Sequence, residues 1–249
     1  MATEEKEEYR KHYVPLESNP EVFTELIQNL GVDVLQFQDV YSVEEPDLMA
    51  LVPRPVYALV LVFPTSDAYE SQKKADEATR SAYAGKGDGE DAVWFRQTIN
   101  NACGLYAILH AVCNGDVKNL IPSTSKLATL LDKVVPLDPV ERARALEDSK
   151  ELEEAHARAA AQGSTAAPNA NDEVDYHYVA FVKSHKNNRL YEMDGRKKGP
   201  VDKGIKLKGD EDLFSEGGLS LVKEFIKREQ DGNPNFSLMA LVPVGSLTV

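Results

Sequence analysis

Residues 97–109 read Gln-Thr-Ile-Asn-Asn-Ala-Cys-Gly-Leu-Tyr-Ala-Ile-Leu, a polar segment that runs directly into an apolar one. The change falls at Cys103, and the pattern predicts a helix from about Cys103 to Val112 with the cysteine at its N-terminus. Unpaired backbone N–H groups and the helix dipole favour negative charge there, which lowers a thiol pKa and favours the nucleophilic thiolate. A cysteine taken at random is more often a small buried hydrophobic residue. The interpretation of Cys103 as a nucleophile therefore requires a side chain nearby that can act as its base.

Among the five histidines, His177 is the best candidate for that base. It opens an apolar strand, residues 177–182, where a polar side chain needs a reason; a hydrogen-bonded core histidine is the alternative. His110 would lie about 10 Å along the predicted helix from Cys103, too far for a hydrogen bond. The other three are expected to be solvated: His12, His156 and His185.

Two further side chains would complete a catalytic centre. A hairpin turn centred between residues 185 and 186 would place Asp194 opposite His177, where it would orient the imidazole; a slip of one residue would put 192 or 196 there. Asp194 is followed by glycine, so it could also be an ordinary turn residue. Gln97 can donate a side-chain N–H to an oxyanion, beside the backbone N–H of Cys103.

The rest of the chain alternates helical and strand patterns. Ser18-Asn19-Pro20 is a helix start, and residues 161–174 lack periodicity and predict a long mobile loop. Further helices are expected near 67–83, 123–133, 138–160 and 217–229, and strands near 34–37, 56–63, 176–184, 188–194 and 236–242. We therefore expect one α/β (α+β) domain over residues 1–249, a mixed sheet packed by helices.

The composition excludes several classes of protein. Hydrophobic residues make up 42% and charged residues 28%, the balance of a soluble globular protein. The net charge of −13 argues against nucleic acid, because phosphate contacts need a basic face. The same charge would speed the approach of a basic partner, although it also serves solubility.

The sequence also predicts no membrane span, no export and no metal site. The longest apolar run, residues 56–63, is far too short to span a bilayer. Residues 4–8, Glu-Glu-Lys-Glu-Glu, stand where a secretory signal would be apolar, so we expect a cytoplasmic protein, with the nucleus as a second compartment. Cys103 and Cys113 would lie roughly 15 Å apart on one helix, beyond disulfide reach. The pattern predicts no metal and no cofactor.

Several segments together resemble the ubiquitin carboxyl-terminal hydrolases, in particular the short, single-domain members. The strongest are residues 97–104, 177–181 and 190–197, and further matching segments run nearly end to end: 15–22, 39–41, 51–55 and 139–144. The resemblance implies a papain-like fold with a central antiparallel sheet, flanking helices and a knotted backbone. It also implies that residues 161–174 form a crossover loop above the active site.

The resemblance further implies roles and a substrate. Gln97 would assist the oxyanion, Cys103 would attack, His177 would act as base and then acid, and Asp194 would orient His177. The reaction would be thiol-dependent hydrolysis of ester, thioester, amide or peptide bonds at the C-terminal glycine of ubiquitin, favouring small or unfolded leaving groups, with NEDD8 as a further substrate. We expect a monomer. The expected ubiquitin contacts are the acidic Glu17, Glu21 and Asp39 and the apolar Leu16 and Tyr176.

Two alternatives remain open on the sequence. The first is a binding module that holds free ubiquitin without turnover, which the presence of all four catalytic residue types disfavours. The second is a general papain-like endopeptidase, which the lack of a signal and prosegment disfavours.

Overall fold

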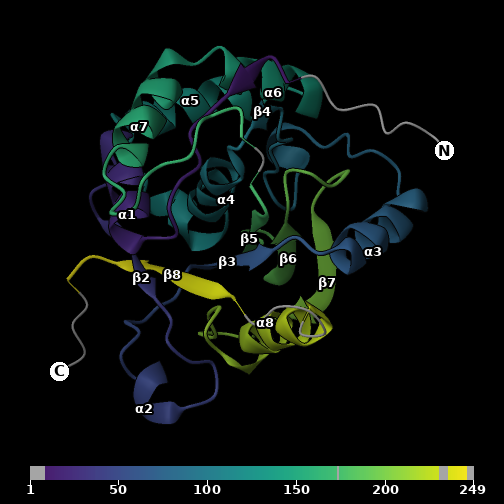
Figure 1. Ribbon diagram of the computed structural model, residues 1–249. Helices are drawn as coiled ribbons and strands as arrows, with labels where there is room; N and C mark the ends of the chain where they lie inside the picture. Colours follow the sequence, from purple (N-terminus) through teal and green to yellow (C-terminus); the bar gives the residue numbers. More distant parts are fainter. Residues whose placement is uncertain (1–8, 173, 230–234, 246–249) are drawn as a thin grey trace.

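The computed structural model describes residues 9–172, 174–229 and 235–245, arranged as Figure 1 shows. At its centre is a six-stranded sheet in the order β2-β8-β3-β5-β6-β7, with every neighbouring pair antiparallel. Its strands are β2 (Leu35–Asp39), β3 (Ala58–Pro64), β5 (Tyr176–Lys183), β6 (Arg189–Met193), β7 (Val201–Lys206) and β8 (Ser237–Pro243). A separate parallel pair joins β1 (Lys11–His12) to β4 (Ile99–Asn100).

Helices cover both faces of this sheet. The α-helices of the described residues are α1 (Pro20–Asn29), α2 (Pro46–Met49), α3 (Asp67–Ala78), α4 (Cys103–Val112), α5 (Lys126–Val134), α6 (Pro139–Glu147), α7 (Lys150–Ala160) and α8 (Glu216–Glu229), with short 3-10 turns at Gly87–Gly89 and Gly115–Leu120. In Figure 1, α4 lies on one side of the sheet and α8 on the other. The predicted α/β class with flanking helices is confirmed, the main sheet is antiparallel throughout rather than mixed, and the knot stays a prediction.

The apolar run at residues 56–63 supplies β3, a central strand of the sheet. Alternate side chains along it point to opposite faces: Val60 joins the core that contains α1 and α4, and Leu61 joins the core that contains α8. Both side chains are fully buried. Because both faces are covered, every position of the strand must be apolar, which explains why the run is unbroken.

Helix starts follow the capping signals in the sequence. The Asn19 side chain caps α1, and α4 spans Cys103–Val112 as predicted. The single helix predicted over 138–160 is instead two, because the Ser149 hydroxyl accepts a hydrogen bond from the Leu152 N–H and begins α7. The helix predicted over 67–83 is shorter and ends at Ala78.

The turn between β5 and β6 lies one residue later than predicted. The Ser184 N–H donates to the Arg189 carbonyl at 2.8 Å, which closes a loop centred between residues 186 and 187. Asn188 in that loop has a φ of 60°, a left-handed conformation that asparagine tolerates well. The later turn shifts the whole hairpin register.

As a result, Asp194 is not directly opposite His177, and that prediction was wrong. The ladder pairs Ala180 with Met193, and its continuation would put residue 196 opposite His177. This is one of the slips that the sequence left open. Asp194 instead follows the end of β6 and reaches His177 from outside the ladder.

The connection from α7 to β5 crosses the molecule over residues 161–174 (Figure 1). Its described residues, 161–172 and 174, contain no helix or strand, as the absence of periodicity predicts. Across the described ranges, every helix is too short or too polar to cross a membrane.

Candidate active site

Cys103 is the first residue of α4, on the side of the sheet that also carries α1. Asn101, two residues earlier, has a φ of 57°, so the chain turns sharply into the helix. The backbone N–H groups of Gly104 and Tyr178 act on the Cys103 thiol and help to lower its pKa. These donors, the helix N-terminus and burial together define the thiol environment.

His177 connects Cys103 to Asp194. Its Nε2 lies 2.8 Å from Asp194 Oδ1. The His177 side chain also acts on the Cys103 thiol, whose pKa it lowers. Because Nε2 is engaged by the carboxylate, Nδ1 is the ring nitrogen left for the thiol. His177 is 2% exposed and Asp194 is fully buried, so the pair is shielded from water.

The pKa values of this group favour a charged pair. Burial lowers the pKa of His177, but the Asp194 carboxylate and the Cys103 thiolate outweigh it and raise that pKa to about 9. Burial raises the pKa of Cys103, but the hydrogen bond and charge of His177 outweigh it, so that pKa lies below its ordinary value. The arrangement therefore favours a thiolate next to an imidazolium.

Both carboxylate oxygens of Asp194 and its backbone carbonyl accept hydrogen bonds. Oδ1 also accepts the Arg196 N–H at 2.8 Å, Oδ2 accepts the Tyr69 hydroxyl at 2.9 Å, and the carbonyl accepts Trp94 Nε1 at 3.0 Å. Burial would raise the pKa of Asp194, but the charge and hydrogen bond of His177 lower it overall, so it is a carboxylate. Sequence reasoning missed Tyr69 and Trp94; an aromatic residue within the polar stretch 67–83 was the one available signal.

Gln97 is tied to the turn that carries Asp194. Its backbone N–H donates to the Gly195 carbonyl at 2.9 Å, and its side-chain Nε2 donates to the Ile99 carbonyl at 3.2 Å. The Nε2 group carries two hydrogens, so one remains for an oxyanion. A β-carbon on Gly195 would lie 2.8 Å from Gln97 Cβ, which is too close, so the approach requires glycine.

Two hollows meet at Cys103. A polar one of about 550 Å³ also contains Gln97 and His177 in its lining, together with Glu70 and Arg196. An apolar one of about 530 Å³ has a lining that includes Leu16, Val62, Pro168, Tyr178 and Phe236. The structure thus brings Gln97, Cys103, His177 and Asp194 into one site with space on both sides of the thiol.

Comparison with known proteins identifies the family. A sequence model of "Ubiquitin carboxyl-terminal hydrolase, family 1" matches residues 13–227. This chain belongs to the ubiquitin carboxyl-terminal hydrolase family. It is a cysteine-type ubiquitin carboxyl-terminal hydrolase, as the resemblance in its sequence implies.

Individual relatives support the assignment along most of the chain. The ubiquitin carboxyl-terminal hydrolase of Aplysia californica is 39% identical over 237 residues, covering 93% of this chain and 100% of that protein. That of Drosophila melanogaster is 36% identical and covers 92% and 96%. The catalytic domain of Trichinella spiralis UCH37, solved bound to ubiquitin vinyl methyl ester, has a TM-score of 0.70 at 23% identity and covers 94% and 97%, which shows a shared fold.

The crossover loop of the hydrolase is tethered at both ends over the site. Glu17 accepts hydrogen bonds from the Ser164 hydroxyl at 2.8 Å and from the Thr165 N–H and hydroxyl at 3.0 and 2.9 Å. These bonds lower the pKa of Glu17, the Thr165 N–H most of all. Near the other end, Asn101 Nδ2 donates to the carbonyls of Ala170 and Asp172 at 3.0 and 2.8 Å.

The remaining expected ubiquitin contacts are distributed around the hollows. Leu16 is 4% exposed and Tyr176 is 41% exposed; both line the apolar hollow, and Tyr176 also lines the polar one. Asp39 lines a further hollow of about 940 Å³ that shares Phe236 with the apolar one, and burial raises its pKa. Glu21 is exposed in the first turn of α1 and lines none of these three hollows.

Two other histidines of the hydrolase are buried. His110 accepts the Phe95 N–H at 3.0 Å, and burial lowers its pKa to about 3. His156 was expected to be solvated, and that was wrong, because its side chain is 2% exposed. Its ring packs at a tilt against that of Tyr13, with 4.6 Å between the ring centroids, and its Nε2 is hydrogen-bonded to the Val14 carbonyl at 2.8 Å. Its burial follows from the packing of residues 13–17 over α7, which helical periodicity alone does not show.

Proposed function

We propose that the protein hydrolyses ester, thioester, amide and peptide bonds at the C-terminal glycine of ubiquitin through an acyl-enzyme on Cys103, favouring small or unfolded leaving groups. The group of Cys103, His177 and Asp194 carries the proposal, because the Asp194 carboxylate holds His177 and His177 lowers the pKa of the Cys103 thiol. The thiolate attacks the glycine carbonyl, and the bond to the leaving group breaks as His177 donates its proton. Water, deprotonated by His177, then cleaves the thioester and regenerates the thiol.

The two hollows divide between the two parts of the substrate. The general acid must face the leaving group, and His177 lines the polar hollow, so the leaving group occupies that side. The ubiquitin tail then occupies the apolar hollow beyond Cys103. Gln97 Nε2 and the Cys103 backbone N–H stabilise the tetrahedral oxyanion between them.

The crossover loop supports the preference for small leaving groups. Fourteen residues can extend over at most about 50 Å, and the hydrogen bonds to Glu17 and Asn101 shorten the free length at both ends. A leaving group must pass beneath this span to reach His177. Small adducts and unfolded peptides fit such a passage, whereas a folded chain of ubiquitin size does not.

Acidic residues mark a route for the arginine-bearing tail of ubiquitin. Glu17 lines the apolar hollow and Asp39 the adjoining one, while Leu16 and Tyr176 supply apolar walls. Glu21 is an exposed carboxylate in the first turn of α1, outside both hollows. NEDD8 is a second substrate under this proposal, and the enzyme acts as a cytoplasmic and nuclear monomer without a cofactor.

One observation favours the alternative of a module that holds ubiquitin. Glu17 is engaged by Ser164 and Thr165, and Asn101 holds the other end of the loop, so the loop restricts the passage of a leaving group before any substrate arrives. If the loop stayed closed in solution, ubiquitin would bind without turnover.

The deciding experiment measures release of a fluorophore from the C-terminus of ubiquitin by wild type and Cys103→Ala, with ubiquitin binding measured in parallel. We expect turnover by wild type alone and binding by both. Binding without turnover by wild type would favour the holding module, and cleavage of casein without activity on ubiquitin would favour a general endopeptidase.

A further inference from the structure

Helix α3 lies outside the group of catalytic residues, yet it contacts the turn that carries Asp194 near both of its ends. Near its start, Tyr69 donates its hydroxyl to Asp194 Oδ2 at 2.9 Å. In the next position, Glu70 pairs with the Arg196 guanidinium at 2.8 Å. The first turn of α3 therefore contacts both the catalytic carboxylate and its neighbour.

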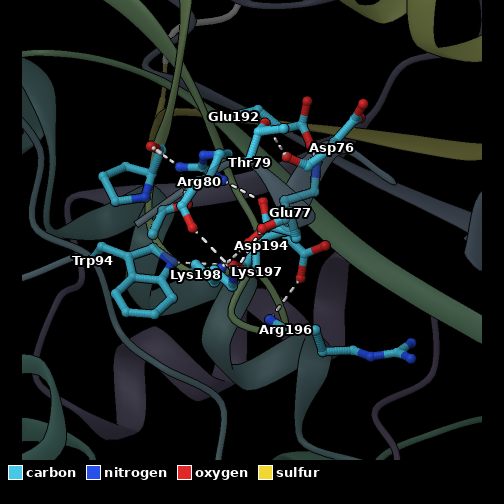
Figure 2. A network of polar contacts seen from close by, with 12 residues as sticks. Asp76, Glu77, Thr79, Arg80, Trp94, Glu192, Asp194, Arg196, Lys197 and Lys198 are labelled. Atoms are coloured by element: carbon cyan, nitrogen blue, oxygen red, sulfur yellow. Dashed lines mark hydrogen bonds and ion pairs between the residues drawn. The ribbon is translucent and has the colours of Figure 1, made fainter. Parts of the chain in front are cut away.

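The other end of α3 holds the far side of the same turn (Figure 2). Lys198 Nζ donates to the Glu77 and Arg80 carbonyls at 2.6 and 3.0 Å. Arg80 in turn donates to the Gly199 and Pro200 carbonyls at 3.3 and 2.9 Å. These six contacts fix the turn against α3 and against Arg80, which follows the end of that helix, independently of the hairpin.

Asp194 needs such support because the sheet does not position it. The ladder of β5 and β6 ends at Met193, and Asp194 lies one residue beyond. Its Oδ1 accepts hydrogen bonds from His177 and from the Arg196 N–H. These two bonds hold one oxygen, so the rotation of the carboxylate group is set by the hydrogen bond to its other oxygen, Oδ2. Tyr69 supplies the donor to that second oxygen.

The Tyr69 hydroxyl is itself rigidly aimed. The side chain is 2% exposed, and its ring packs edge-on against Phe63 at 4.8 Å and near Phe225 at 6.4 Å. The ring also lies 6.4 Å from that of His177. A hydroxyl on a ring packed in this way keeps one direction, unlike that of a serine or threonine.

We propose that Tyr69 is a positioning residue of the active site, whose hydroxyl orients the Asp194 carboxylate so that the His177 ring stays aligned with Cys103. This rests on the proposed function, and no feature of the sequence pattern assigns it. Burial and the Asp194 charge raise the pKa of Tyr69 well above its ordinary value, so the hydroxyl remains protonated and donates throughout the working range.

The test is Tyr69→Phe, which keeps the ring and removes the hydroxyl. Losing a hydrogen bond to a buried carboxylate should lower kcat by about 10-fold, with KM and ubiquitin affinity unchanged. Alkylation of Cys103 by iodoacetamide at neutral pH should slow in parallel, because a misaligned imidazole supports the thiolate less well. The upper limb of the pH profile should move to lower pH, since His177 loses part of its carboxylate support.

Two controls separate positioning from general damage. Tyr83→Phe also removes a hydroxyl bonded to a carboxylate, that of Glu90 at 3.2 Å. It keeps the ring against Trp94 and the backbone bond to the Lys198 carbonyl, so it should leave kcat unchanged. In an Asp194→Asn background, Tyr69→Phe should have little further effect, because both changes break the same link. The alkylation rate needs no ubiquitin substrate, so it tests Tyr69 even if the proposed hydrolysis fails.

Three results would overturn the assignment. An unchanged kcat and alkylation rate in Tyr69→Phe would show that the hydroxyl is dispensable. A fall that persists in full in the Asp194→Asn background would show that Tyr69 acts by another route. An equal fall in Tyr83→Phe would show a general packing effect.

Discussion

Asp194 Oδ1 lies 2.8 Å from His177 Nε2 although the hairpin register does not pair these two residues. The contact comes from a turn beyond the end of β6, held by Tyr69, Trp94 and the Arg196 N–H. Catalytic alignment therefore depends on loop and helix contacts as much as on the sheet. Changes in those contacts should alter activity without unfolding the protein.

Replacing the orienting carboxylate is the most direct check. Asp194→Asn should lower kcat/KM by roughly 10³- to 10⁴-fold, because an amide neither stabilises the imidazolium nor selects its tautomer. Ubiquitin binding should persist, since Asp194 is buried behind His177. Asp116→Asn, which removes an exposed carboxylate paired with Lys183, is the matched control. A wild-type rate for Asp194→Asn would remove this residue from the mechanism.

Local signals in the sequence predicted much of the site. The change from polar to apolar residues at Cys103 placed the start of α4, because helix capping and periodicity are set by neighbours in the chain. His177 was identifiable as a polar residue on an apolar strand, and it is buried there. Gln97 and Asp194 were predicted from their spacing in the sequence and from the family resemblance. The structure places both near Cys103 and His177.

What the sequence could not show depends on contacts between distant segments. Tyr69 and Trp94 are 125 and 100 residues from Asp194, and no local pattern predicts either hydrogen bond. The hairpin register depends on the turn, in which Asn188 has a left-handed backbone conformation. Asparagine tolerates this conformation but does not require it, so the sequence did not determine the register. The tether between Glu17 and Ser164 also joins segments far apart in sequence.

Thiol reactivity should distinguish the two cysteines. The pKa of Cys103 is lowered by His177 overall, so iodoacetamide should label it well below pH 8. Cys113 is 1% exposed and burial raises its pKa far above the ordinary value, so it should stay unlabelled in the folded protein. Peptide mapping by mass spectrometry locates the label, with Cys113→Ala as the control. Equal, slow labelling of both would contradict an activated thiol.

The pH dependence of kcat/KM should be bell-shaped. Above about pH 9 the rate should fall as His177 loses its proton, because its pKa is raised to about 9 and the leaving group needs that proton. On the acid side the rate should fall as the thiolate is protonated, below the ordinary thiol pKa since that of Cys103 is lowered. The two apparent pKa values that define these limbs belong to Cys103 and His177 as a coupled pair. A rate that rises steadily through pH 9 would instead indicate an ordinary thiol with neutral histidine.

Gly195 should be needed for the position of Gln97. A β-carbon there would lie 2.8 Å from Gln97 Cβ and 3.1 Å from its backbone nitrogen, so Gly195→Ala must displace the oxyanion residue or the turn. We expect kcat to fall by roughly 10- to 100-fold, with stability only modestly affected. Gly89→Ala, where an added β-carbon meets no atom within 4 Å, should change neither. Normal kinetics for Gly195→Ala would show that the segment adapts freely.

The tether between Glu17 and the crossover loop yields two variants with opposite effects on ubiquitin. Ser164→Ala with Thr165→Val removes both hydroxyl donors to Glu17, so the loop loosens and the carboxylate is freed for a ubiquitin arginine. Glu17→Gln weakens the same tether but removes the charge that would attract the arginine. If Glu17 serves both partners, KM for a ubiquitin substrate should fall about threefold in the first variant and rise in the second.

Protease sensitivity of the free enzyme separates the two roles of Glu17. Cleavage within residues 161–172 should speed up in both variants, because each loses tether bonds. Only Glu17→Gln should reduce the salt dependence of ubiquitin binding, because only that change removes a charge. The same rise in KM in both variants would show that the ordered loop itself, rather than the freed carboxylate, binds ubiquitin, and Glu17 would then be a structural anchor alone.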